Sequence, residues 1–143
     1  MRVSFGTDEV SDVTTAILDH LTVLGHEVIG PVEAAWPLVG QYVGRAVAEG
    51  EADRGIVCCW TGTGVAMAAN KVAGVRAALC SDSETARGAR RWNDANVLAL
   101  GLRLTSTPMA REIVEVFLSA VDVDPEEIDN IRRLDDPGVG SNP

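Results

Sequence analysis

The sequence predicts an α/β fold, a three-layer α/β/α sandwich around a five-stranded parallel, Rossmann-like sheet. Short β-rich runs alternate with longer segments of helical periodicity, which is the pattern of strand–helix–strand crossover units. The run at 55–59 is continuously apolar, as expected of a parallel strand covered on both faces. A chain of 143 residues is long enough for one domain with a substantial core.

Each element follows from its local pattern. Strands are predicted at 2–6, 26–30, 54–59, 75–80 and 96–100, and helices at 11–24, 37–49, 64–72, 83–91 and 108–120. Ser11 suits the cap of the first helix, and Gly25 stands where a helix-ending glycine belongs. A further short helix is predicted at 125–134. We expect one domain over residues 1–134 and a disordered tail at 135–143, because the tail is rich in Gly, Pro, Ser and Asn.

Charge and composition exclude several function classes. The formal net charge is −9 and Lys71 is the single lysine, so binding to nucleic acid is not expected. No apolar run approaches the ~20 residues of a membrane span, and the first residues form a strand instead of a signal peptide. We therefore expect a cytoplasmic protein with no membrane partner. Cys58, Cys59 and Cys80 have no metal-ligand spacing and are expected to be reduced thiols.

The strongest local signal is the loop Cys59-Trp-Thr-Gly-Thr-Gly64, between the third strand and the third helix. Ligands of parallel sheets bind beyond the carboxyl ends of the strands. A glycine-rich turn there exposes main-chain N–H groups at the positive end of a helix, which favours an anion or a developing oxyanion. The loop matches neither the dinucleotide fingerprint nor a Walker loop. A tight turn without a ligand is the alternative interpretation.

Cys59 is the candidate base of this loop. It leads into the turn, where the helix N-terminus favours a thiolate. A thiolate at that position can remove a proton α to a carbonyl while the loop amides stabilise the enediolate. Cys58 is predicted to point to the opposite side of the strand, and Cys80 to be a buried small hydrophobe. A purely structural role for Cys59 remains the alternative.

Several motifs together resemble a known family. These are GIVCCWTGTGVAMAANK at 55–71, VAGVRAALC at 72–80, ARRWNDANVL at 89–98, GLR at 101–103 and FGTDE at 5–9. They are similar to ribose-5-phosphate isomerase B and the galactose-6-phosphate isomerase subunits, and the similarity runs from about residue 2 to residue 120. The resemblance implies an aldose–ketose isomerase that needs no metal or organic cofactor. It also implies a homodimer or homotetramer whose pockets are completed by a neighbouring subunit.

The resemblance assigns roles residue by residue. Cys59 falls on the catalytic base and Thr61 on the hydroxyl associated with ring opening. Main-chain groups of the loop form the anion hole, Asp8 and Asn93 contact the sugar, and Arg103 grips the substrate phosphate. The members of the anion hole are Gly62, Thr63 and Gly64.

Four positions depart from the family pattern. Glu9 stands where a histidine is usual, and we expect its carboxylate to serve as an acid or base. Trp92 replaces the ring-opening histidine, Trp36 a tyrosine, and Trp60 a glycine. All three tryptophans of the chain therefore fall on pocket positions, where aromatic faces pack well on sugar C–H groups.

The C-terminal segment also departs from the family. An acidic stretch at 122–127 replaces a basic run that reaches the partner's phosphate site, so the substrate is expected to be a sugar phosphate or a related, less charged sugar. A catalytically silent sugar-binding or partner subunit is the alternative function. Arg87, Arg90 and Arg91 are interpreted as a solvated helix face, and contact of one of them with a ligand is the alternative.

Overall fold

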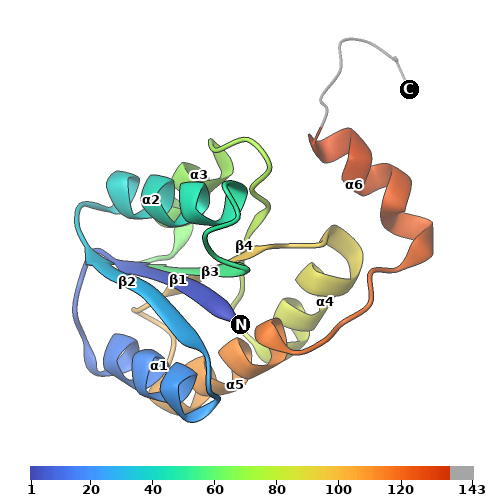
Figure 1. Cartoon of the computed structure of the whole chain (residues 1–143). Helices are drawn as coiled ribbons and strands as arrows, with labels where there is room; N and C mark the ends of the chain where they lie inside the picture. Colours follow the sequence, from blue (N-terminus) through green and yellow to red (C-terminus); the bar gives the residue numbers. More distant parts are fainter. Residues whose placement is uncertain (136–143) are drawn as a thin grey trace.

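The computed structural model of the chain, shown in Figure 1, describes residues 1–135. Its strands are β1 (Arg2–Thr7), β2 (Glu27–Glu33), β3 (Arg54–Cys59), β4 (Ala77–Leu79) and β5 (Val97–Gly101). Its helices are α1 (Asp12–Val23), α2 (Trp36–Ala48), α3 (Thr63–Asn70), α4 (Ser83–Asn93), α5 (Thr107–Leu118), the 3₁₀ turn η1 (Pro125–Glu127) and α6 (Ile128–Asp135). Asp135 is thus helical, and the rest of the predicted tail lies outside the described residues.

The predicted strands and helices are present, and two strands differ most from their predicted boundaries. β2 continues three residues further than expected, to Glu33. β4 spans only the three residues Ala77–Leu79, and just before it the Arg76 N–H donates to the Asn96 side chain at 2.8 Å. Ser11 caps α1 as predicted, and its hydroxyl accepts the Thr14 N–H at 3.3 Å.

All strand pairs are parallel and the strand order is β2-β1-β3-β5-β4. The steps from β1 to β2 and from β4 to β5 run in one direction along the sheet, and the other two steps run the opposite way. Because such crossovers are right-handed, α1 and α4 cover one face, and α2 and α3 cover the other. Figure 1 shows this division, with α5 packed beside α1. The predicted three-layer α/β/α class is confirmed.

The two faces of the sheet carry separate apolar cores. Phe5, Ile56 and Phe117 belong to the core under α1, α4 and α5. The core under α2 and α3 is built largely of Val and Ala. α2 approaches α3 closely at Gly40, where an added Cβ would lie 2.6 Å from the Ala68 Cβ. This close packing holds the start of α3 in place at one end of the sheet.

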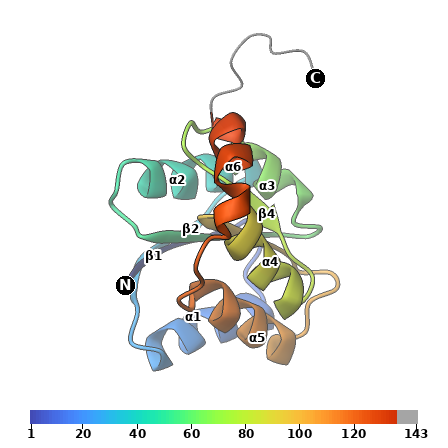
Figure 2. The ribbon, with the colours of Figure 1, turned by 90° about the vertical axis from the view of Figure 1, so that its right-hand side faces the viewer.

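The last described segment stands apart from the sandwich. Figures 1 and 2 show α6 beside α4, projecting away from the layers. Ion pairs connect this segment to the body: Arg91 to Asp124 at 3.3 Å and Arg76 to Asp135 at 2.8 Å. No side chain of α6 is fully buried. Among residues 1–135, no helix is both long and apolar enough to cross a membrane.

Candidate active site

The candidate site lies at the carboxyl edge of the sheet, between β1 and β3. These strands are neighbours in the sheet, but the chain leaves them toward opposite faces, β1 into α1 and β3 into α3. Such a switch point leaves a crevice beyond the strand ends. The loops that flank this crevice follow Thr7 and Cys59.

Cys59 ends β3 with its sulfur held against the start of α3. The Gly62 N–H donates to the Cys59 Sγ at 3.2 Å, and only 5% of Cys59 is exposed. Gly62 is the N-cap of α3 and has a φ of 76°, in the left-handed region. A Cβ at this position would lie 2.8 Å from the main chain of Gly101, so the turn requires glycine. The sulfur therefore sits at the positive end of a helix dipole.

Hydroxyl and aromatic side chains surround this helix start. The Thr61 and Thr63 hydroxyls lie 2.8 Å apart and hydrogen-bond to each other. The Trp36 ring covers Gly64, because a Cβ there would lie 3.0 Å from ring carbons. Trp60, in the loop itself, is 56% exposed. The N-terminus of α3 thus has an aromatic wall on one side and open hydroxyls on the other.

The loop after β1 brings two carboxylates to this edge. The Asp8 N–H donates to the Cys58 carbonyl at 3.3 Å, which joins this loop to the end of β3. The Thr7 hydroxyl donates to the Glu9 carbonyl at 2.7 Å and accepts the Glu9 N–H, which orders the turn. Burial raises the pKa of the Asp8 carboxyl, and its Oδ1 has no hydrogen-bond partner within residues 1–135. Asp8 thus has an acceptor free for a ligand.

The loop after β5 completes the edge. The Leu102 N–H donates to the Cys59 carbonyl at 3.0 Å, and the Arg103 N–H donates to the Trp60 carbonyl at 2.9 Å. The exposed Arg103 therefore follows directly beside the Cys59 loop. Asp8, Glu9, Trp36, the loop 59–64 and Arg103 all lie at this edge of the sheet.

Trp92 and Asn93 are not brought to Cys59 within one chain. α4 starts after β4 at the carboxyl edge and runs back, so its last residues lie near the start of β5 at the amino edge. The Trp92 ring lies over Gly88, where a Cβ would be 2.6 Å from it. Both side chains are exposed and line a groove of about 950 Å³ that also includes Leu79 and Leu134.

The other two cysteines are packed as predicted. Cys58 belongs to the core on the opposite face from Cys59 and is completely buried. Burial raises the pKa of the Cys58 thiol far above its usual range, and burial raises that of Cys80 to about 12. Neither thiol is suited to act as a thiolate near neutral pH.

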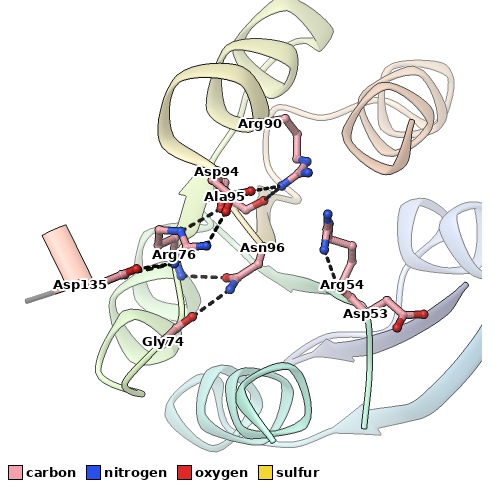
Figure 3. A network of polar contacts seen from close by, with 9 residues as sticks. All are labelled: Asp53, Arg54, Gly74, Arg76, Arg90, Asp94, Ala95, Asn96 and Asp135. Atoms are coloured by element: carbon pink, nitrogen blue, oxygen red, sulfur yellow. Dashed lines mark hydrogen bonds and ion pairs between the residues drawn. The ribbon is translucent and has the colours of Figure 1, made fainter. Parts of the chain in front are cut away.

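The sequence interpretation missed three features. Leu79 presses on the Cys59 loop, because a Cβ at Gly62 would lie 2.5 Å from its Cδ1. Gly101 allows the Thr61 carbonyl to approach, since a Cβ there would lie 2.7 Å from that oxygen, and a glycine at the end of β5 was the available signal. Arg90 was assigned to a solvated face but is only 5% exposed, because it bonds the Ala95 carbonyl at 2.6 Å and Asp94 at 3.1 Å (Figure 3).

Comparison with known proteins identifies the family. The family model described as Ribose/Galactose Isomerase matches residues 3–135. The chain belongs to the ribose/galactose isomerase family. This confirms the resemblance drawn from the motifs, and the relatives described next are sugar-phosphate isomerases.

Individual members of the ribose/galactose isomerase family are similar over most of their length. The galactose-6-phosphate isomerase subunit LacB of Clostridium acetobutylicum is 41% identical over 126 residues, which cover 84% of this chain and 73% of the relative. Ribose-5-phosphate isomerase B of Escherichia coli is 40% identical over 125 residues, 83% of this chain and 84% of the relative. The solved structure of ribose-5-phosphate isomerase B from Clostridium thermocellum superposes with a TM-score of 0.89 at 38% identity, covering 96% of this chain and 97% of that one.

Proposed function

We propose that this protein is an aldose–ketose isomerase that acts on a sugar phosphate or a related sugar, with Cys59 as the base. The observation that carries the proposal is the position of the Cys59 sulfur, which accepts the Gly62 N–H at 3.2 Å at the N-terminus of α3. The N-terminus of a helix and a main-chain N–H donor are groups that favour a negative charge beside them, which suits a sulfur that is to act as a base. Membership of a sugar-isomerase family supports the same reaction.

The proposed reaction moves one proton between neighbouring carbons. The open-chain sugar places its carbonyl oxygen against the main-chain N–H groups that start α3. The Cys59 thiolate removes the proton from the carbon next to the carbonyl, and the electron pair forms an enediolate whose negative oxygen those N–H groups stabilise. Cys59 then returns the proton to the former carbonyl carbon, while a second proton passes between the two oxygens. Glu9 and Thr61 are the candidates for that second transfer. The chemistry requires no metal and no organic cofactor.

Binding groups surround this centre in the proposed complex. The free Oδ1 of Asp8 accepts a sugar hydroxyl, and Arg103 binds the phosphate or a terminal hydroxyl. Trp36 and Trp60 pack on the C–H faces of the sugar. The Asn93 amide and the Trp92 ring complete the pocket only if another copy of the chain supplies them.

We therefore propose a homodimer in which each site receives Trp92 and Asn93 from the other copy. Both side chains are exposed in one chain, and they lie at the opposite edge of the sheet from their own Cys59. A stable two-fold interface is expected to bury about 1,600 Å² of total surface. A monomer in sedimentation analysis at micromolar concentration would contradict this part of the proposal.

Isotope exchange tests the reaction itself. A panel of pentoses, hexoses and their phosphates is incubated with the protein in D₂O, and deuterium at the carbon next to the carbonyl is followed by NMR. We expect enzyme-dependent incorporation together with aldose–ketose interconversion for at least one sugar. Binding without any incorporation would instead support a catalytically silent sugar-binding subunit.

Mixing two inactive variants tests the shared site. In a heterodimer of Cys59→Ala and Asn93→Ala, one site carries both changes and the other carries neither. Co-expression of the two variants should restore about a quarter of the wild-type activity, since random pairing gives about half heterodimers. If the mixture is no more active than either variant alone, each site is complete within one chain.

A further inference from the structure

The amino edge of the sheet carries a second group of charged side chains, far from the Cys59 loop. Figure 3 shows Arg54 at the start of β3, Arg76 before β4 and Arg90 on α4 converging there. The chain as a whole carries a net charge of −9, and these arginines form a locally positive group within it. The partners of each arginine show how this charge is balanced.

The carboxylates of the network are committed to other cations. Asp53 accepts the Arg2 N–H at 2.7 Å and pairs with the Arg2 guanidinium at 3.1 Å. Asp94 gives one oxygen to Arg76 at 2.7 Å and the other to Arg90 at 3.1 Å. Asp135 pairs with Arg76 at 2.8 Å. None of these three carboxylates is left for Arg54.

Arg54 therefore has no counter-ion among residues 1–135. Its Nη1 donates at 2.7 Å to the main-chain carbonyl of Asp53, and no carboxylate of the described chain lies within ion-pair distance. Figure 3 shows its guanidinium pointing toward that of Arg90. Burial and, second, the positive charge of Arg90 lower the pKa of the Arg54 guanidinium, and the charges of Asp94 and Asp53 offset this lowering only in part. The two positively charged guanidinium groups thus face each other, and most N–H groups of Arg54 have no acceptor within the described residues.

Arg90 itself has one polar atom without a partner. Its Nη1 is satisfied by Asp94 and by the Ala95 carbonyl, and the guanidinium lies 5.9 Å from the centre of the Phe117 ring. Its Nε is buried and has no hydrogen-bond partner within the described residues. A buried N–H without an acceptor is costly, so an acceptor supplied from outside would be stabilising.

We propose that Arg54 and Arg90 form a binding site for a small oxyanion, of the phosphate or sulfate class. A guanidinium presents its N–H groups in a planar fork that matches such oxyanions, and a bound anion would remove the repulsion between the two arginines. Arg54 is partly exposed, which gives the anion access from solvent. The site lies at the opposite edge of the sheet from Arg103 of the same chain. Neither Arg54 nor Arg90 is among the residues assigned to the proposed substrate site.

Thermal unfolding with inorganic phosphate tests this site. The wild type is compared with Arg54→Gln, with Arg103→Gln and with the charge-matched control Arg111→Gln, an exposed position on α5. Sodium chloride at equal ionic strength is the reference for each protein. We expect phosphate at tenfold excess over its Kd to raise the wild-type Tm by about 3–6 °C beyond chloride. This added rise should be unchanged in Arg111→Gln. Arg54→Gln should lose the part that comes from the Arg54 site, and Arg103→Gln should lose only the part that comes from phosphate at the proposed substrate site.

The behaviour without phosphate provides a second readout. Because Arg54→Gln removes a like-charge contact, its Tm in low salt should equal or exceed that of the wild type. An Arg54→Gln protein that responds to phosphate as the wild type does would overturn the proposal, as would a wild type with no added response. An equal shift with chloride would contradict the assignment to an oxyanion. Arg54→Met keeps the apolar stem and provides the same comparison if Arg54→Gln does not fold.

Discussion

The two edges of the sheet use polar residues in opposite ways. At the carboxyl edge, one Asp8 carboxyl oxygen has no partner in the described part of the chain, and Thr61, Thr63 and Trp60 are exposed to solvent. At the amino edge, Asp94 uses both carboxyl oxygens and Asn96 bonds through both ends of its amide, to the Arg76 N–H and the Gly74 carbonyl. The carboxyl edge, called the open edge below, has polar groups available to a ligand. The amino edge, called the closed edge, has hydrogen bonds that hold the strands β3, β4 and β5 together.

This difference indicates where to look for function in such a sheet. Polar side chains whose hydrogen bonds are complete stabilise the fold, whereas those left incomplete lower the stability unless a ligand completes them. Arg54 and the Arg90 Nε are the exceptions at the closed edge, and for that reason they carry the proposal of an anion site. Four substitutions separate the two edges experimentally.

Arg90→Gln is expected to have the largest effect on stability. The change removes the bonds to Asp94 and the Ala95 carbonyl and the contact with the Phe117 ring. Loss of a buried charged partner of this kind costs about 3 kcal/mol in the free energy of unfolding. Urea unfolding measures it, with Arg87→Gln as the exposed control on the same helix, expected to change by less than about 1 kcal/mol. If Arg90→Gln and Arg87→Gln lowered the free energy of unfolding equally, the hydrogen bonds of Arg90 at the amino edge would not stabilise the fold.

Cys59→Ala is expected to abolish activity while sparing the fold. Loss of a general base costs about 100-fold or more in rate. Steady-state kinetics on the best sugar of the exchange panel measures this. The control is Cys58→Ala, which removes a completely buried thiol on the other face and should lower stability by about 1–2 kcal/mol with turnover retained. Wild-type activity in Cys59→Ala would contradict the proposal that Cys59 is the catalytic base.

Gly62→Ala is expected to destabilise the open edge by about 2–3 kcal/mol, through left-handed strain and overpacking. The φ of 76° disfavours any Cβ, and the new atom would lie 2.5 Å from Leu79 and 2.8 Å from the Gly101 main chain. The matched control is Gly25→Ala, which has a φ of 74° but nothing within 4 Å of the new Cβ. Gly25→Ala should lower the free energy of unfolding by about 1 kcal/mol, because it disfavours the backbone conformation but causes no steric clash. Chemical denaturation measures the free energy of unfolding of both variants. Equal losses in Gly62→Ala and Gly25→Ala would show that the Cys59 loop accommodates the new Cβ without a steric penalty.

Asp8→Asn is expected to have the smallest effect on stability, and in the favourable direction. Because burial raises the pKa of the Asp8 carboxyl, the ionised form is disfavoured in the folded protein at neutral pH. The stability contributed by this group is complete below its ordinary pKa of about 4 and is lost as the pH rises through the higher folded value. The Asn variant should thus be more stable at pH 7 by up to about 0.5 kcal/mol, since solvent screens the group.

The same variant tests the ligand role of Asp8. The stability difference from wild type should vanish below about pH 4, where both proteins carry a neutral side chain. Activity at pH 7 should fall by about tenfold, the loss of one hydrogen bond to the sugar. A variant that is less stable at pH 7 and fully active would show that the Asp8 carboxylate is structural.

Local signals were enough to predict much of the fold. The apolar run at 55–59, the Ser11 cap and the glycines of the Cys59 loop each act over a few residues, so their physical meaning can be read from neighbouring positions. The same locality explains why Cys59 and Gly62 were identified as site candidates, whereas Asp8 was identified through the resemblance to the family. Each follows directly from the end of a predicted strand, and parallel strands end at one edge.

The sequence by itself therefore determined the α/β class, the strand-ending loops and the opposite orientation of Cys58 and Cys59, because strand periodicity and helix capping are local. Only the tertiary structure decided the order β2-β1-β3-β5-β4, which brings Arg54, Arg76 and Arg90 to one edge from distant parts of the chain. It also decided that Arg90 is buried and that Trp92 and Asn93 lie away from Cys59. Burial and convergence depend on which strands become neighbours, and strand neighbours are chosen by packing over the whole chain.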